Sequence, residues 1–352
     1  MYINLMVIID DIGSFPLPYG TVKEEFNRIY PEVMEACAEG EKLENKPEFG
    51  TFTNAVKESL WRKINSGLDV VNYPQHFDMH RQFLEPLMKH QTEPFIVDRK
   101  YAVIPELYVA EQEAKKYYEE KGEALKLKVC VTGAIELYLK TDFGYNVYEE
   151  VLLNIAESVN RFVKNSILNT KYIKTEVVSI DEPSLGFVDL LNIDKEGIIK
   201  ALDKSVEGTN IKKQIHLHTL KSSEYPLNSY NIDVITGEFA STPKNMELIS
   251  KRELEHNDKF IRAGVVSTNI DYKLGKLAEN GIKKPNVEML VDTYDYIENT
   301  YRKLKGRFGE RIAFAGPDCG LGSWPSQEAA QEVLRRAVEV VRKVEGSRHK
   351  LQ

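Results

Sequence analysis

Two histidines separated by one residue are the sharpest chemical signal in the chain. His216 and His218 close an apolar, β-branched run. Side chains two positions apart on a strand point to the same face, so both imidazoles can reach one metal ion. Imidazole is the commonest metal ligand, although many histidines are hydrogen-bonded core residues instead. The spacing alone leaves both interpretations of this pair open.

Glu238 and Cys319 follow later apolar runs and add oxygen and sulfur donors. Cys319 lies in PDCGLG, a stretch rich in turn residues, which argues against its being a small buried hydrophobe. Two imidazoles, a carboxylate and a thiol suit tetrahedral zinc, and they suit Mg²⁺ or Ca²⁺ poorly. We therefore expect Zn²⁺ to be held by His216, His218, Glu238 and Cys319.

Two further motifs have the composition of ligand-binding segments. Asp181 and Glu182 precede Pro183, and adjacent side chains on an extended chain face opposite ways, so one can face a site and the other the wall. An acid pair in the first turn of a helix is the alternative interpretation. The loop Ile12–Pro16, IGSFP, can expose backbone N–H groups to a carboxylate.

Short β-branched runs alternate with helical patterns along the 352 residues. The runs expected to be strands are Ile3–Ile9, Leu68–Asn72, Leu127–Val131, Thr175–Ile180, Lys213–His218, Ile232–Thr236, Phe260–Val265 and Ile312–Ala315. Buried parallel strands are typically continuous apolar runs separated by crossover helices. Eight βα units predict a (β/α)₈ barrel, with a doubly wound open sheet as the alternative. No glycine-rich phosphate loop follows an expected strand, which weakens the nucleotide-binding form of the open sheet.

Apolar residues at helical spacing follow the expected strands. The clearest stretches are Glu149–Lys164, Lys244–Glu255, Val287–Lys305 and Gln327–Glu345, the last with Ser326 as candidate N-cap. In barrel enzymes the chemistry lies at the carboxyl ends of the strands. The candidate metal ligands and Asp181 all fall at such ends.

The segment Tyr73–Glu120 is longer than a simple βα connection and contains YPQHFDMHRQF. We interpret it as an insertion after the second strand, lying over the barrel mouth. No linker or charge block divides the chain, and no repeat of 20–50 residues is apparent, so residues 1–352 are expected to form a single barrel domain.

Composition excludes several classes of function. Hydrophobic residues make up 42% of the chain, which is enough for a large core. The net charge of −7 lacks the footprint of a nucleic-acid binder. No stretch approaches the ~20 apolar residues of a membrane-spanning helix, and the first residues do not resemble a secretory signal. Three scattered cysteines argue against a disulfide framework, so the expected location is the cytoplasm.

In their order along the chain, these motifs resemble the catalytic barrel of the cobalamin-independent methionine synthases. The most specific are IGSFP at Ile12–Pro16, IDEP at Ile180–Pro183 and GPDCGL at Gly316–Leu321, with DVITGE at Asp233–Glu238 between the last two. The resemblance covers nearly the whole chain, to about Trp324. The usual long form of the family has an additional N-terminal barrel, so this chain resembles the short, stand-alone form found chiefly in archaea.

The resemblance implies a zinc-dependent methyltransferase that converts homocysteine to methionine. Ile12 and Ser14 would lie in the loop that holds the homocysteine carboxylate, and Asp181 would bind its amine. His216, Glu238 and Cys319 match zinc-ligand positions. The methyl donor implied is a methylated reduced pterin or folate, or a methylcobamide, which a partner protein could carry.

Three departures from the family pattern stand out. The family's His-x-Cys motif here reads His216-Leu217-His218, which exchanges a thiolate for an imidazole. The family's glutamate for the substrate amine corresponds to Gln75, which can accept a hydrogen bond without charge pairing. The segment before Asp78 is two residues shorter, and the loop 267–276 lacks the family's aspartate-histidine pattern, which the long form uses for its general acid.

A methylated pterin leaves through nitrogen and needs a proton from a general acid. Asp78, His76 and His80 are the candidates for that role, whereas a methylcobamide donor needs none. Two alternatives remain: a related zinc barrel that methylates another thiol, and a non-catalytic accessory homologue. Zinc-dependent hydrolysis is disfavoured, because the remaining histidines lie at no expected strand end.

Overall fold

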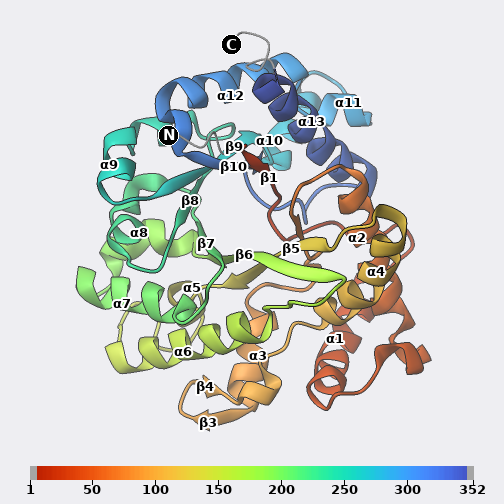
Figure 1. The fold of residues 1–352 in the computed structure, drawn as a ribbon, viewed down its shortest axis with the longest axis vertical. Helices are drawn as coiled ribbons and strands as arrows, with labels where there is room; N and C mark the ends of the chain where they lie inside the picture. Colours follow the sequence, from red (N-terminus) through yellow and green to blue (C-terminus); the bar gives the residue numbers. More distant parts are fainter. Residues whose placement is uncertain (1–5, 347–352) are drawn as a thin grey trace.

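The computed structural model describes residues 6–346. In it the eight apolar runs form one parallel sheet. Its order is β1-β10-β9-β8-β7-β6-β5-β2. The strands are β1 (Ile8–Ile9), β2 (Val71–Asn72), β5 (Leu125–Thr132), β6 (Ile173–Asp181), β7 (Lys212–His216), β8 (Val234–Gly237), β9 (Phe260–Val266) and β10 (Ile312–Pro317). A parallel bridge between Asp10 and Val70 joins the two ends of this order. The predicted (β/α)₈ barrel is thereby confirmed (Figure 1).

Several strand boundaries differ from the prediction, and one of these differences, at the end of β7, concerns the site. Residues 3–5 of the expected strand Ile3–Ile9 lie outside the described residues. The expected strand Lys213–His218 ends at His216, so His218 lies in the loop that follows β7. The predicted placement of both histidines on one strand was therefore wrong, and His218 is held by the loop after β7.

Helices surround the sheet (Figure 1). Those that follow the barrel strands are α2 (Gly50–Asn65), α4 (Pro105–Lys121), α5 (Ala134–Tyr138), α6 (Glu149–Asn165), α7 (Lys195–Val206), α8 (Glu224–Asn228), α9 (Lys251–His256), α10 (Ile270–Glu279), α11 (Val287–Leu290), α12 (Tyr294–Phe308) and α13 (Gln327–Gly346). The hydroxyl of Ser326 accepts from the Ala329 N–H, which confirms the predicted N-cap of α13. Within residues 6–346 no helix is long and apolar enough to cross a membrane.

Two predicted helices are each interrupted, and that part of the prediction was wrong. The stretch Lys244–Glu255 splits into a 3₁₀ helix, Pro243–Glu247, and α9, because Ser250 and Glu253 form a capping box that starts α9 afresh. The stretch Val287–Lys305 splits into α11 and α12, because Thr293 caps α12. Apolar spacing continues across both breaks, which is why periodicity alone merged them.

Three elements lie outside the eightfold pattern. Helix α1 (Lys23–Ala38) precedes α2 and builds a second apolar cluster, which includes Phe26, Tyr30 and Phe77. Between β2 and β5 lie α3 (Arg81–Lys89), the hairpin β3 (Gln91–Glu93) and β4 (Ile96–Val97), and then α4. Residues of the hairpin bond to Ser158 of α6, so this part lies against the outer helices (Figure 1).

The interior of the barrel changes from apolar to charged along its axis. Val70, Val177, Val234 and Phe314 form an apolar layer at the amino-terminal side. Beyond it the carboxylate of Asp10 accepts from Lys128 Nζ at 2.9 Å and from Arg262 Nε at 2.5 Å, and all three side chains are fully buried. Two basic side chains share one carboxylate there, and burial, together with the charge of Arg262, lowers the pKa of Lys128. Loss of any one partner would leave a buried charge uncompensated.

Candidate active site

Four side chains with metal-binding atoms converge at the carboxyl ends of β7, β8 and β10. One atom each of His216, His218, Glu238 and Cys319 lies within 4.8 Å of the others. Cys319 Sγ lies 3.4 Å from His216 Nε2 and 3.7 Å from His218 Nε2, and His218 Nε2 lies 3.7 Å from Glu238 Oε1. Tetrahedral zinc, with bonds of about 2.0–2.3 Å, requires ligand separations of about 3.3–3.6 Å. The cluster is consistent with a zinc site.

Burial favours the neutral form of all four groups, and a bound cation would reverse this only for Glu238 and Cys319. It lowers the pKa of both His216 and His218, so both imidazoles are in the neutral form that binds metals. Burial, aided by the charge of Asp318, raises the pKa of Glu238 to about 8, and burial also raises the pKa of Cys319. A divalent cation inverts this preference, because it stabilises carboxylate and thiolate directly. The donor set therefore fits a zinc ion that supplies the missing positive charge.

The loops bearing Glu238 and Cys319 are fastened to each other by the carboxylate of Asp318. It accepts from the backbone N–H groups of Phe239 at 3.0 Å, Ala240 at 3.1 Å and Ser241 at 2.5 Å. Asp318 is fully buried, next to Cys319 in sequence. These hydrogen bonds fix the separation between the loop that bears Glu238 and the loop that bears Cys319.

A second clamp, Asn245, was missed by the sequence analysis. Its Nδ2 donates to the carbonyl oxygens of His218, at 3.2 Å, and Glu238, at 2.9 Å, while its Oδ1 accepts from the Leu220 N–H. Asn245 is fully buried. One side chain thus joins the backbones of two candidate ligands. A lone asparagine in a short 3₁₀ helix carries no sequence signal for such a role.

The loop Ile12–Pro16 meets both the β10 loop and the β2 loop. Ser14 Oγ accepts from the Gly322 N–H at 3.3 Å, and Ser14 pairs with Gln75 in a parallel bridge. The buried Nζ of Lys63 donates to Asp11 Oδ2 and to the Gly13 carbonyl, which holds the start of this loop in place. Ile12 is buried.

Asp181 ends β6 and lies beside His216 in the register of β6 and β7. Ser179 Oγ donates to its Oδ1 at 3.1 Å. Burial raises the pKa of Asp181 to about 6, against the opposing influence of Lys128 and of the Ser179 bond. Its neighbour Glu182 faces the wall, where it accepts from N–H groups at the start of α5. The two side chains thus face opposite ways, as expected for adjacent residues on an extended chain, and Glu182 has a structural role at the start of α5.

The structure separates the three candidate general acids. His76 packs edge-on against Phe26 of the α1 cluster, its Nδ1 contacts the Phe15 carbonyl, and burial lowers its pKa to about 4. Asp78 is exposed and accepts from the N–H groups of His80 and Arg81, at the start of α3. Neither His76 nor Asp78 is thus directed toward the four candidate metal ligands.

His80 has a different environment, because its Nε2 lies 2.7 Å from Glu136 Oε1. The Ser184 N–H donates to the other oxygen of Glu136. Although burial opposes it, the bonds from His80 and Ser184 lower the pKa of Glu136. The charge of Glu136 opposes the lowering of the His218 pKa that burial causes. Glu136, which the sequence analysis did not single out, thus orients His80 through a direct hydrogen bond.

Comparison with known proteins gives a consistent result. No protein-family model matches the sequence. A methionine synthase of Sulfolobus acidocaldarius is 23% identical over 210 residues, 59% of this chain and 54% of that protein. A methionine synthase of Methanocaldococcus jannaschii is 25% identical over 236 residues, 65% of this chain and 68% of that protein. The chain thus matches about half the length of the Sulfolobus relative.

The fold comparison covers almost the entire chain. A B12-independent methionine synthase from Shewanella sp. W3-18-1, solved in complex with selenomethionine, superposes with a TM-score of 0.62 at 15% identity. The superposition covers 97% of this chain and 98% of that one. The sequence relatives are methionine synthases, and the fold is similar to that of a B12-independent methionine synthase, so both comparisons agree with the resemblance carried by the motifs.

Proposed function

We propose that this chain is a zinc-dependent methyltransferase that methylates the thiol of homocysteine to form methionine. The observation that carries the proposal is the convergence of His216, His218, Glu238 and Cys319 at the barrel mouth, beside Asp181. A site that joins a thiol-binding metal to an amine-binding carboxylate suits an amino acid with a thiol side chain. The methionine synthases among the sequence relatives support this choice of reaction.

A thiol must lose its proton before it can attack a methyl group, because only the thiolate is nucleophilic. A free thiol has a pKa of about 8.5 and is mostly protonated at neutral pH. Zinc, held by the four clustered side chains, would supply a Lewis acid that favours the thiolate. With two imidazoles and one protein thiolate, the donor set would leave more positive charge on the metal than the family's usual set.

The amino-acid end of the substrate would be held by residues of this chain alone. Asp181 would accept hydrogen bonds from the ammonium group, and Ser14, with the backbone N–H groups of its loop, would bind the carboxylate. Ser14 and Gln75 are paired across the β1 and β2 loops, so the carboxylate, at Ser14, and the ammonium group, at Gln75 and Asp181, would be bound close to each other. Such positioning aligns the sulfur with the incoming methyl group.

The contacts of His80 favour a methylated pterin or folate as donor over a methylcobamide. The nitrogen that leaves a methylated pterin must be protonated, and His80, whose Nε2 lies 2.7 Å from Glu136 Oε1, would be the general acid that gives that proton. A methylcobamide would leave without protonation. The variant His80→Gln should therefore lose most activity with the pterin donor and keep it with the cobamide. The exposed His256 offers a control substitution, His256→Gln, which should alter neither activity.

The direct test is methionine formation by the zinc-loaded protein, with homocysteine and each donor in turn. Methionine from either donor supports the proposal, and the donor that works settles the role of His80. Methylation of another thiol, without methionine, would move the function to a related thiol methyltransferase. If neither product forms and homocysteine does not bind, the chain is an accessory homologue and the proposal is wrong.

A further inference from the structure

A chain of buried polar side chains lies behind Gln75. Its Nε2 contacts Gln82 Oε1 at 2.8 Å and the Tyr73 hydroxyl at 3.4 Å. Gln82 Nε2 contacts the same hydroxyl at 3.5 Å. Beyond Gln82, the hydroxyl of Tyr30 donates to Glu106 Oε2 at 3.0 Å. All five side chains are buried, so each polar contact replaces water.

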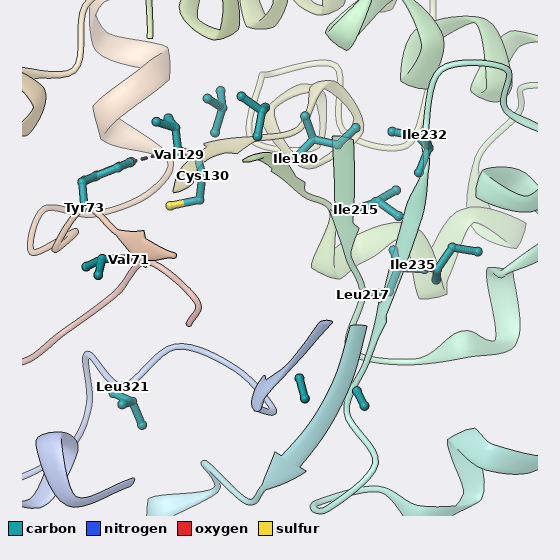
Figure 2. Close-up of a cluster of buried hydrophobic side chains, with 14 of the residues drawn as sticks. Val71, Tyr73, Val129, Cys130, Ile180, Ile215, Leu217, Ile232, Ile235 and Leu321 are labelled. Atoms are coloured by element: carbon teal, nitrogen blue, oxygen red, sulfur yellow. Dashed lines mark hydrogen bonds between the residues drawn. The ribbon is translucent and has the colours of Figure 1, made fainter. Parts of the chain in front are cut away.

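The backbone of β5 sets the direction of these hydrogen bonds. The Tyr73 hydroxyl lies 2.9 Å from the carbonyl oxygen of Cys130, which can only accept, so the hydroxyl must donate to it (Figure 2). A phenol has one hydrogen, and the Tyr73 oxygen is thereafter an acceptor only. The amide atoms of Gln75 and Gln82 that face it must therefore be nitrogens. Gln82 then presents Oε1 to Gln75, as the 2.8 Å contact requires.

This polarity leaves one atom of Gln75 for a ligand. Both hydrogens of Nε2 are committed to Tyr73 and Gln82, and within residues 6–346 no group donates to Oε1. Oε1 lies toward Gly13, since it is 3.6 Å from the position that a Cβ on Gly13 would occupy. Gln75 follows β2, and β5 lies between β2 and β6, at whose end Asp181 pairs with Thr132. Gln75 and Asp181 thus lie at the carboxyl ends of two strands that only β5 separates in the sheet.

We propose that Gln82 is a positioning residue, which together with Tyr73 locks the amide of Gln75 so that its carbonyl oxygen accepts a hydrogen bond from the ammonium group of the substrate. This inference rests on the proposed function and names how the amine is recognised. The ammonium meets one charged acceptor, Asp181, and one neutral acceptor of fixed direction, Gln75.

The network also accounts for glutamine at position 75. A carboxylate there could not donate to Tyr73 or to Gln82 Oε1, and it would face two lone pairs at close range. A freely rotating amide could present its NH₂ group to the ammonium, which would repel it. Gln82 removes that alternative, so a neutral side chain serves as an acceptor.

The test compares two thiols in the zinc-loaded protein by titration calorimetry: homocysteine and 4-mercaptobutyrate, which has the thiol and carboxylate but lacks the amine. In Gln82→Leu the dissociation constant for homocysteine should rise about tenfold, which is the loss expected for a charged hydrogen bond. The constant for 4-mercaptobutyrate should not change. Gln82→Glu, protonated when buried, keeps an acceptor for Gln75 and should restore most of the affinity.

A double-mutant cycle makes the indirect role of Gln82 explicit. In a Gln75→Leu background, Gln82→Leu should have no further effect on homocysteine binding, because Gln82 acts through Gln75. Gln331→Leu, which removes a glutamine that bonds to Arg62 on the outer helices, is the control and should leave both constants unchanged. Equal losses for both thiols, or additive effects in the cycle, would overturn the inference. If the wild-type protein binds neither thiol, the proposed function itself fails.

Discussion

The two sides of the barrel mouth are built in different ways. On the side of β7, β8 and β10, the candidate metal ligands are fixed through the backbone, by the carboxylate of Asp318 and the amide of Asn245. On the side of β2, Gln75 is fixed by other side chains, Tyr73 and Gln82. Backbone clamps preserve a geometry whatever the ligand side chain is, whereas a side-chain network must change together with the residue it holds.

This difference explains which departures from the family pattern each side can accept. An imidazole at position 218, where the family pattern that the sequence resembles has a cysteine, would keep the number of donors, and Asn245 holds the carbonyl of residue 218 whichever side chain it carries. Gln75 replaces the family's glutamate only together with partners that suit an amide. The predictions below test the metal side, the amine side and the network behind it.

The largest effect should come from Cys319→Ala, which removes the one sulfur donor of the cluster. We expect the variant to lose bound zinc and methionine formation together, because three remaining donors hold the ion far less tightly. Metal analysis and the methyl-transfer assay measure the two losses. Cys37→Ser, in the α1 cluster, is the control and should retain zinc. Normal methionine formation by Cys319→Ala would contradict the assignment.

The next largest effect should come from Asp181→Asn, which keeps the size of the side chain and removes its charge. The homocysteine ammonium would then lose its charged partner. Asp10 alone would remain to balance the charges of Lys128 and Arg262. We expect homocysteine affinity to fall about 10–100-fold, as for loss of a charged hydrogen bond. Calorimetry measures it, with zinc content as the control. Unchanged affinity would exclude Asp181 from amine binding.

A smaller effect on the metal side should follow from Asn245→Ala. The variant leaves all four donors in place but frees the carbonyls of His218 and Glu238 from their shared clamp. Zinc affinity should fall about tenfold, as is usual when groups that orient metal ligands are lost. Competition with a chelator measures it. Asn257→Ala, at the end of α9, is the matched control and should not weaken zinc binding.

The last prediction concerns stability and not binding, at Glu106, the end of the β2 network that is farthest from Gln75. Burial raises the pKa of Glu106 from its ordinary 4.5 to about 8. A carboxyl whose folded pKa is raised contributes stability that is complete below about pH 4.5 and is lost as the pH rises through 8. Glu106→Gln cannot ionise. When the pH is raised from 6 to 9, the free energy of unfolding should fall in the wild type. The fall should be about 1–3 kcal/mol smaller in Glu106→Gln.

Urea titrations at the two pH values provide this comparison. Glu120→Gln, on the exposed face of the same helix, should reproduce the wild-type pH dependence. An identical fall in Glu106→Gln and in the wild type would mean that the buried carboxyl does not titrate in this range, and the account of the network's end would be wrong.

The sequence predicted the parts that depend on periodicity and on strand ends. All eight strands and the positions of His216, Glu238 and Cys319 follow from apolar runs and what comes after them. It did not predict Asn245, Glu136 or Gln82, because each acts through one long-range contact that leaves no local pattern. It also merged α11 with α12, since a cap at Thr293 is a weaker signal than continued apolar spacing.

The central claim, that the four-residue cluster binds a metal to which a substrate thiol is added, has a direct spectroscopic test. Cobalt(II) would be exchanged into the wild-type protein, and its thiolate-to-metal charge-transfer absorption recorded as homocysteine is added. We predict one thiolate band from Cys319 that grows by a second, saturable contribution from homocysteine, and no band in Cys319→Ala without substrate. A cobalt spectrum without a thiolate band in the wild type, or one that homocysteine leaves unchanged, would contradict the account.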